Sequence, residues 1–547
     1  MNMSSVEPIF AFVGGIATHL LYFKHGERHA YPWRYVFLLL TGSASIWSVK
    51  WYRMQLPILT ASCQTIVLTT LYLSGLMLSL VIYRLFFNPL NKFPGPYVAR
   101  LTKLYFVYIN AQSGLHGHHV LHILHKQYGP YVRIGPNDLS IVDPEGMPVV
   151  LGPNSKCRKS EWYGQDMPYI STNTTRDRKL HDRRRRILTP AFTDKFLRGY
   201  MMRTQKFNEL LIARIDDHEG KPMNVTKWFH LHGFDVMGDL VFNKSFNMLQ
   251  SGETHWAIKL LEDGTHIQGY AFPPWLYRVF ATLPGMGSGY RRFVQLCIDQ
   301  LDERMKLQGK TTHMDMIEPL ITHFQSLSPE DQKNALPMLQ GDSRMLIVGG
   351  SDSSSTTLIH MFYRFCTEPG LAQRVRDEVA PMVSNINQIQ YQDIRDAQLL
   401  HGCIKETLRM HYPAPSGFFR KTPKEGIHIG DVFIPADTVI QNPPYIVGQD
   451  ENVYERCNEF IPERWYSRPE MVKRMDAYSP FLAGSEACIG KPLAYQMLSV
   501  LASQILLQFD VAFAPGEDGT TLVQESRDFS MLNVAELNLV FTRRSGE

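Results

Sequence analysis

The sequence predicts a mainly helical protein with a small β portion, preceded by a membrane region. Apolar runs occupy 9–23, 35–51 and 58–87 near the N-terminus. A single helical pattern then extends unusually far, over 335–365. Strand-type alternation is short and clearest in 131–142, on either side of a turn signal. These observations favour a membrane anchor followed by a large helical domain.

Composition narrows the class of protein. The chain has 547 residues, of which 44% are hydrophobic, enough for one large domain or two or three ordinary ones. Its 56 basic and 52 acidic side chains nearly cancel, and without a basic tail nothing indicates a nucleic-acid partner. Seven scattered cysteines without C-x-x-C pairs favour a reducing compartment over a disulfide framework or a zinc ribbon.

Residues 1–87 are predicted to form a membrane region with one to three transmembrane helices. The run at 58–87 is long enough to cross a hydrocarbon core of about 30 Å. The runs at 9–23 and 35–51 are shorter and carry polar residues. A cleaved signal peptide is disfavoured because no short apolar run precedes a clear small-residue cleavage site.

The orientation of the chain follows from its charges. With three spans, Lys24, Arg28 and Arg34 would mark a cytoplasmic first loop, and the rest of the chain would also face the cytosol. A proline-rich segment, 88–96, follows and reads as a stiff hinge or an ordinary linker. The third predicted part is a catalytic domain at 97–547.

The long helical pattern carries two glycines in its middle, Gly349 and Gly350, followed by Asp352 and Ser353. Each glycine costs about 1 kcal/mol relative to alanine, so the helix must gain something from the missing side chains. An acid followed by an alcohol beside such a gap could hold water and O2 over a metal and relay protons. A serine-rich helix that bends or packs closely is the alternative.

Two further patterns place charges on helical faces. His181 and Arg185 stand at i and i+4 within a run of four arginines, so both could reach one pair of carboxylates. The alternative is a solvated basic face. Glu406 and Arg409 stand at i and i+3, and as a surface pair they would contribute a few tenths of a kcal/mol, roughly.

A single cysteine, Cys488, lies in a glycine-punctuated loop that leads into a helix-compatible segment. We expect Gly484 and Gly490 to give the loop backbone freedom and Phe481 to supply an apolar wall. A helix that starts near Gly490 would direct its N–H groups at the sulfur and favour a thiolate. Such a thiolate suits ligation of a haem iron. The alternative is a buried free cysteine.

These motifs, in this order and spacing, resemble the cytochrome P-450 family over roughly residues 88 to 545. The sequence F-x-x-G-x-x-x-C-x-G at 481–490 is similar to the cysteine-ligand loop of that family. Residues 349–354 are similar to its A/G-G-x-D/E-T-T pattern, with serine where threonine is usual. The resemblance implies a single, mostly helical haem domain with a small sheet near its entrance, most like fungal members with several N-terminal spans.

The resemblance also implies roles for individual residues. Cys488 would be the axial ligand of a haem b iron. His181-x-x-x-Arg185 matches the family's propionate-binding W-x-x-x-R or H-x-x-x-R, and Arg420 is a third candidate. The remaining cofactor contacts would be Phe481, Gly484 and Gly490.

Two other sets of residues take roles by the same resemblance. Asp352 and Ser353 would deliver protons during catalysis. Glu406, Arg409 and Arg464, the last within F-I-P-E-R-W, would form a buried charged triad that fixes the core behind the haem. Breaking such a buried pair costs several kcal/mol.

One residue departs from the family pattern. The family loop usually carries Arg or His two residues before the cysteine, where it binds a haem propionate, and this chain has Glu486. A carboxylate that faces a carboxylate would cost roughly 1–4 kcal/mol near a protein surface, unless it is turned away or protonated. We therefore expect Glu486 to weaken haem retention.

The expected function is that of a membrane-bound haem-thiolate monooxygenase. It would insert one oxygen atom of O2 into a lipophilic alkaloid, terpenoid or polyketide of fungal secondary metabolism, at the endoplasmic reticulum with the catalytic domain in the cytosol. NADPH would supply electrons through a membrane-bound flavin reductase, which would dock on basic residues such as Lys491 and 183–186. The alternatives are an oxygen-independent haem-thiolate isomerase or dehydratase and a non-catalytic haem-binding membrane protein.

Overall fold

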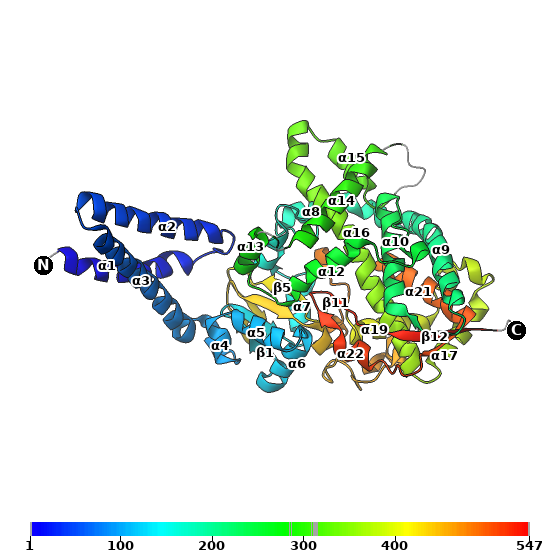
Figure 1. The fold of residues 1–547 in the computed structure, drawn as a ribbon. Helices are drawn as coiled ribbons and strands as arrows, with labels where there is room; N and C mark the ends of the chain where they lie inside the picture. The colour runs from blue at the N-terminus through cyan, green and yellow to red at the C-terminus, as the bar shows by residue number, and fades with distance from the viewer. Residues whose placement is uncertain (1–2, 284, 286, 308, 310–314, 545–547) are drawn as a thin grey trace. The chain divides into compact units, whose positions relative to one another are not determined.

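The computed structural model describes residues 3–283, 285, 287–307, 309 and 315–544. The chain divides into two compact units, which are drawn as ribbons in Figure 1. The first consists of Met1–Tyr108, Val132–Leu139 and Phe272–Gly287, and the second of Ile109–Tyr131, Ser140–Ala271 and Ser288–Glu547. These units are defined by their internal packing. The end of the membrane region at 87 and the start of the catalytic domain at 97 therefore stay predictions.

The first unit contains the three apolar runs, and all three are helical. They form α1 (Met3–Thr18), α2 (Pro32–Ser48) and α3 (Ile58–Ile82). α1 and α3 pack closely, and two glycines allow this approach. A side chain at Gly15 or at Gly75 would collide with the backbone of the other helix.

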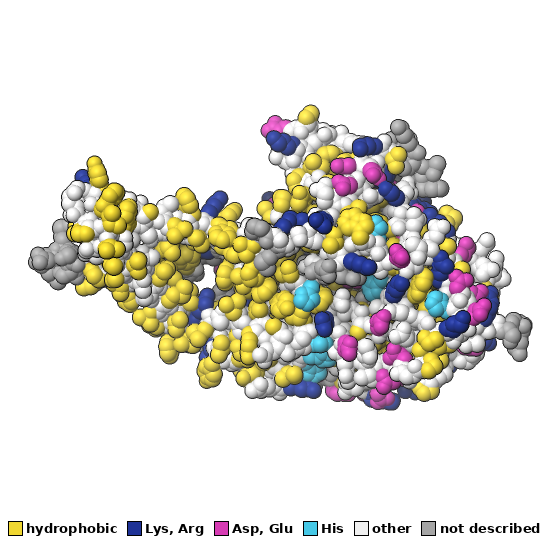
Figure 2. Space-filling model, in the orientation of Figure 1, with side chains coloured by type: hydrophobic (Ala, Val, Ile, Leu, Met, Phe, Trp, Pro, Cys, Tyr) yellow, Lys and Arg dark blue, Asp and Glu magenta, His cyan; other side chains and the backbone are white. Residues whose placement is uncertain are grey.

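Two segments of the first unit are long and apolar enough to cross a membrane, Val6–Phe23 and Ile58–Phe87. The middle run, at 35–51, does not meet this criterion although it is helical. Hydrophobic side chains cover much of the visible surface of these helices (Figure 2), and Leu21 and Leu59 are about four-fifths exposed. This surface is consistent with membrane anchoring.

The proline-rich segment that follows contains a short turn of 3-10 helix, η4 (Pro89–Lys92). Asn88 caps it, because its side chain accepts a hydrogen bond from the Leu90 N–H at 2.8 Å. Proline at the first helical position needs no hydrogen-bond partner. The sequence predicts a stiff hinge or an ordinary linker here, and the asparagine cap explains why part of the segment is helical.

The expected hairpin at 131–142 is present. β1 (Tyr131–Arg133) and β2 (Asp138–Ile141) are hydrogen-bonded neighbours, and the N–H of Ile134 donates to the carbonyl of Asp138 at 3.0 Å. The other elements of the first unit are α4 (Tyr97–Leu101) and α13 (Pro274–Thr282), and α5 (Leu104–Gln112) leads into the second unit.

The second unit is mainly helical, which confirms the predicted fold class. Its helices are α6 (Gly117–Tyr128), α7 (Gly146–Leu151), α8 (Arg178–Leu188), α9 (Asp194–Asp217), α10 (Val225–Phe242), α11 (Met248–Ser251), α12 (Trp256–Gly269), α14 (Ser288–Lys306), α15 (Glu318–Gln325), α16 (Pro329–Thr367), α17 (Leu371–Val379), α18 (Tyr391–Ile394), α19 (Gln398–Met410), α20 (Pro444–Val447), α21 (Lys491–Gln508) and α22 (Thr520–Glu525).

The strands of the second unit form small antiparallel groups. One group contains β3 (Arg158–Lys159), β5 (Phe418–Lys421) and β8 (Val439–Asn442). A three-stranded sheet consists of β4 (Met223–Asn224), β12 (Asn538–Arg543) and β9 (Phe509–Phe513). Two pairs are β6 (Ile427–Ile429) with β7 (Val432–Ile434) and β10 (Arg527–Asp528) with β11 (Leu532–Asn533).

The longest helix, α16, has 39 residues and packs against α10, α14 and α19 (Figure 1). It begins earlier than the sequence pattern predicted because Ser328 caps it and Pro329 occupies the first turn. Its glycines have separate uses. A side chain at Gly350 would collide with Met237 of α10, whereas a Cβ at Gly349 would meet nothing within 4 Å. Gly350 therefore leaves room for the end of the Met237 side chain, and Gly349 borders open space.

A buried ionic cluster joins α19 to the segment around η9 (Pro462–Trp465). Arg409 Nη2 lies 2.7 Å and Arg464 Nε 3.0 Å from Glu406 Oε1, and all three side chains are fully buried. The indole N–H of Trp465 donates to Glu406 Oε2 at 2.8 Å. Since each charge is both paired and hydrogen-bonded, the cluster can persist in the interior.

Candidate active site

The loop before α21 has a fixed backbone around Cys488. The N–H of Cys488 donates to the carbonyl of Phe481 at 2.7 Å. Gly484 has φ +65°, and a side chain there would lie 2.5 Å from Pro153 Cα. Both conditions require glycine at this position.

Gly490 has a different role from the one expected. Its φ is −80°, which any residue adopts, so the loop does not need its backbone freedom. A Cβ at this position would lie 3.8 Å from Cys488 Sγ. The absence of a side chain at Gly490 therefore keeps space beside the sulfur, and α21 begins at the next residue, Lys491.

The protonation of Cys488 differs from the sequence expectation. Its side chain retains exposed surface, yet desolvation by the protein packed around it raises the pKa of the thiol above its ordinary value. The N–H groups of Gly490 and Lys491 and the charge of Arg185 oppose this rise, because they favour the thiolate. The protein alone therefore favours the thiol, and a bound metal ion would deprotonate it.

Five charged or titratable side chains gather beside this loop. Lys159 Nζ lies 2.7 Å and His181 Nε2 3.6 Å from Glu486 Oε2. Arg185 donates to the loop carbonyl of residue 487 at 2.5 Å. Arg420 is buried and close enough to help lower the pKa of Glu486. We call these five residues the cation cluster.

The carboxyl of Glu486 is ionised within the cation cluster. Burial alone would raise its pKa, but the positive charges of Lys159, His181 and Arg420 outweigh burial and hold the pKa below its usual value. The sequence predicted a carboxylate that repels a propionate, and the structure instead turns this carboxylate onto a buried lysine.

Local structure explains why these side chains converge. α8 starts at Arg178 because the Asp177 side chain accepts from two N–H groups of its first turn. Within the arginine run, Arg184 is buried and pairs with Asp342, whereas 183 and 186 are exposed. The run therefore has one inward, one intermediate and two solvated members rather than a single basic face.

The cation cluster is continuous with a cavity through Tyr163. Lys159 and Arg420 are register partners in the β3/β5 pair, which places them directly opposite each other. Arg420 donates to the Tyr163 hydroxyl at 2.9 Å, and Tyr163 lines a cavity of about 460 Å³.

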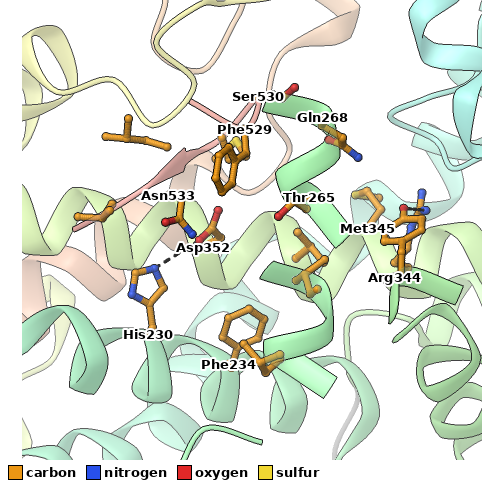
Figure 3. A pocket seen from close by; sticks show the side chains of 18 of the residues that line it. His230, Phe234, Thr265, Gln268, Arg344, Met345, Asp352, Phe529, Ser530 and Asn533 are labelled. Carbon is orange, nitrogen blue, oxygen red and sulfur yellow. Dashed lines mark hydrogen bonds and ion pairs between the residues drawn. The ribbon is translucent and has the colours of Figure 1, made fainter. Parts of the chain in front are cut away.

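The cavity lies between α10, α12, α16 and the segment 529–534 (Figure 3). Asp352 from α16 and His230 from α10 both line it and contact each other, with 3.4 Å between Asp352 Oδ1 and His230 Nε2. His230 Nδ1 lies 2.7 Å from the carbonyl of Thr226, which can only accept, so Nδ1 carries a proton. Nε2 is therefore an acceptor in the neutral ring and a donor to Asp352 in the charged one.

Ser353, the residue after Asp352, is placed differently. Its hydroxyl donates to the carbonyl of Gly349 at 2.8 Å, one helical turn earlier. Gly349 and Asp352 line the cavity, and Ser353 is not among the described residues that line it. The structure thus places the carboxylate of Asp352 at the cavity, whereas the hydroxyl of Ser353 is hydrogen-bonded within α16.

Two segments far apart in the sequence, 418–419 and 531–532, both line the cavity. They are joined through Asp528, which accepts a hydrogen bond from the hydroxyl of Ser416. The N–H of Ser530 also donates to Asp528, at 3.1 Å. Burial raises the pKa of Asp528 to about 6 despite these two donors.

Sequence reasoning missed several of these residues. His230 lies in the first half of α10, where the sequence shows no motif, and Lys159 lies in a two-residue strand. Asn533 also lines the cavity, next to Asp352 in Figure 3. The only available signal for Lys159 was the unexplained Glu486, which required a cation.

Comparison with protein-family models now decides the family. The model described as cytochrome P450 matches residues 99–536. The chain belongs to the cytochrome P450 family. The predicted resemblance is therefore confirmed.

Curated relatives cover nearly the whole P450 chain. It is 66% identical over 543 residues to the cytochrome P450 monooxygenase lcsK of Purpureocillium lilacinum, with 99% of each chain covered. It is 36% identical to the cytochrome P450 monooxygenase notG' of Aspergillus versicolor, with 100% of this chain and 99% of the relative covered. It is 34% identical to the tryprostatin B 6-hydroxylase of Neosartorya fischeri, with 97% of each covered.

These relatives and the family match make the chain a fungal P450 monooxygenase of secondary metabolism, which confirms the predicted enzyme class. Membership in this family implies a haem-thiolate cofactor, molecular oxygen and an organic substrate. The N-terminal apolar helices are consistent with the membrane anchoring of fungal P450 enzymes.

The residues near Cys488 fit a haem. The loop offers a thiol with space beside the sulfur. In the cation cluster, the basic side chains of Lys159, Arg185 and Arg420 outnumber the single carboxylate of Glu486 by two. Two haem propionates would match that excess, and arginine and lysine are the usual partners of such carboxylates.

Proposed function

We propose that this P450 oxidises a lipophilic secondary metabolite in the cavity beside the cation cluster, with the haem iron bound by Cys488. The contact between Arg420 and Tyr163 carries this proposal, because it makes the cofactor-type charges and the cavity parts of one site. The oxygen atom would come from O2, and the electrons from NADPH through a membrane-bound flavin reductase.

The residues that would hold the cofactor are those of the loop and the cluster. Cys488 would bind the iron, while His181, Arg185 and Arg420 would bind the propionates. The bound haem supplies oxygen activation, in which a thiolate ligand favours O–O cleavage. Gly490 would leave space beside the sulfur, because it has no side chain.

Asp352 would pass protons from solvent to the reaction centre. Its carboxylate lines the cavity and is 24% exposed, so it can exchange protons with water. His230 at 3.4 Å would orient it. Ser353 would act as the alcohol partner only by rotating its hydroxyl away from the Gly349 carbonyl.

The cavity favours a mainly apolar substrate with a few polar groups. Aromatic and aliphatic side chains such as Phe234, Phe529 and Met345 form much of its wall, and Asn533 and Thr265 add hydrogen-bonding groups. An alkaloid, terpenoid or polyketide with a few polar atoms would suit these walls.

We further propose that the enzyme resides in the endoplasmic reticulum membrane with its catalytic domain in the cytosol. There, Arg183, Arg186 and Lys491 would form part of the reductase surface, because all three are exposed and Lys491 begins the helix after Cys488. The inward position of Arg184 removes that residue from the surface.

The test is the reduced, CO-bound difference spectrum of membranes that contain the protein, beside the same preparation of Cys488→Ala. We expect a strongly red-shifted Soret band in the parent and its loss in the variant. Product formation from candidate metabolites with NADPH and a reductase then identifies the substrate. If the parent lacked the band in membranes that contain the protein, the haem-thiolate assignment would be wrong.

A further inference from the structure

The pair formed by Lys159 and Glu486 is built into the site rather than placed on its surface. The Lys159 side chain is 3% exposed, and its ammonium lies 2.7 Å from Glu486 Oε2. The β3/β5 pairing fixes the backbone of Lys159 opposite Arg420. A lysine buried to this degree requires a negative partner, and Glu486 provides one.

The ammonium of Lys159 has N–H donors that are not used by the described residues. Apart from Glu486 Oε2 at 2.7 Å, Nζ has no hydrogen-bond partner among the described residues. An ammonium has three donors and a buried one gains from using them. The unused donors belong to the same cluster as His181 and Arg185, which would hold the propionates.

The positive charge lies on a different residue in this chain than in other members of the family. Where the family usually has a cation two residues before the cysteine, this chain has a carboxylate, with a buried lysine in contact with it. The pair together is neutral, so replacing Glu486 by a cation would leave two like charges about 3 Å apart in a poorly solvated place.

We propose that Lys159 and Glu486 act as one unit, in which Glu486 positions Lys159 and Lys159 supplies the donor to a haem propionate that residue 486 supplies in other members. This inference rests on the proposed function. It reverses the expectation from the sequence, because Glu486 then supports haem retention and its replacement by the family residue weakens it.

The test is a double-mutant cycle on the holoenzyme, with the rate of haem transfer to an excess of apomyoglobin as the readout. We expect Glu486→Arg to lose haem at least about tenfold faster than the parent, because two cations then meet at the site. Lys159→Met should also lose haem faster. Combining both changes should return the rate to within about threefold of the parent, since the single cation is restored at residue 486.

A second lysine–glutamate ion pair, at the protein surface, provides a matched control. Lys156 and Glu425 form an ion pair in which both side chains are more than half exposed, so Lys156→Met should leave the transfer rate unchanged. Glu486→Gln adds no charge and keeps the cycle informative if the arginine variant does not fold. We expect it to lose haem faster than the parent.

Three results would overturn the proposal. Slower haem loss in Glu486→Arg would show that Glu486 weakens the site, and multiplicative effects in the double variant would show that the residues are uncoupled. Parent-like haem transfer in Lys159→Met would exclude a propionate contact by Lys159. Because the CO-bound spectrum of the parent reports thiolate ligation separately, each result is distinct from failure of the proposed function.

Discussion

Removing Arg409 should prevent accumulation of folded holoprotein. Its guanidinium donates to both carboxylate oxygens of Glu406, at 2.7 and 2.9 Å. It also donates to the carbonyls of Cys457 and Glu459, at 2.7 and 3.0 Å, and to that of Gly448. The variant Arg409→Ala therefore leaves a buried carboxylate short of one cation and removes the donor from three backbone carbonyls, two of them in buried residues.

The magnitude follows from these contacts. Breaking a buried ion pair costs about 3–5 kcal/mol, and each orphaned buried carbonyl adds about 1–3 kcal/mol unless water reaches it. Glu406 keeps Arg464 at 3.0 Å and the Trp465 indole at 2.8 Å, so part of its charge stays compensated. A loss of about 4 kcal/mol or more is a large share of a typical folding free energy of about 5–15 kcal/mol.

The assay compares holoprotein, from the CO difference spectrum of membranes, with total protein from immunoblotting. Arg374→Ala is the matched control, because Arg374 is about half exposed and pairs with Glu463, so its loss should cost at most about 1 kcal/mol. Arg409→Lys should be intermediate, since lysine keeps the charge but loses the forked geometry. Normal yield and spectrum in Arg409→Ala would refute the assignment of a stabilising buried cluster.

Three other outcomes are expected. Because burial raises the pKa of Asp528 to about 6, its contribution to the free energy of unfolding is present below about pH 4 and lost as pH rises through 6. The free energy of unfolding of Asp528→Asn, measured by urea unfolding, should therefore fall less between pH 4 and pH 7 than that of the parent. An equal fall in the two proteins would contradict this. Asp352→Asn should lower product per NADPH consumed by about tenfold or more while substrate binding, followed by the Soret shift, stays within about twofold; full coupling would remove Asp352 from proton delivery. Arg186→Glu should slow reduction by the reductase more at low salt than at high salt, in stopped-flow measurements, and a salt-independent effect would count against a docking role.

Features carried by local patterns could be predicted from the sequence. The existence of the long helix α16, the start of α21 after Gly490 and the i, i+3 spacing of Glu406 and Arg409 all depend on residues close together in the chain. The second arginine of the triad, Arg464, was found because a family pattern supplied its spacing.

Features that depend on distant partners could not be predicted in this way. Lys159 approaches Glu486 only because β3 pairs with β5, and a two-residue strand has no detectable periodicity. His230 faces Asp352 through the packing of α10 on α16. The pKa of Cys488 depends on how much protein surrounds the sulfur, which no local motif specifies.

The hydrogen bond between Ser416 and Asp528 has a consequence for engineering the range of substrates. Ser416 and Asp528 connect the two segments that end in the cavity walls, 418–419 and 529–534. A substitution that shifts one wall would move the other through this bond. Libraries that recombine both segments from one parent enzyme should therefore retain more folded variants than libraries that exchange either segment alone.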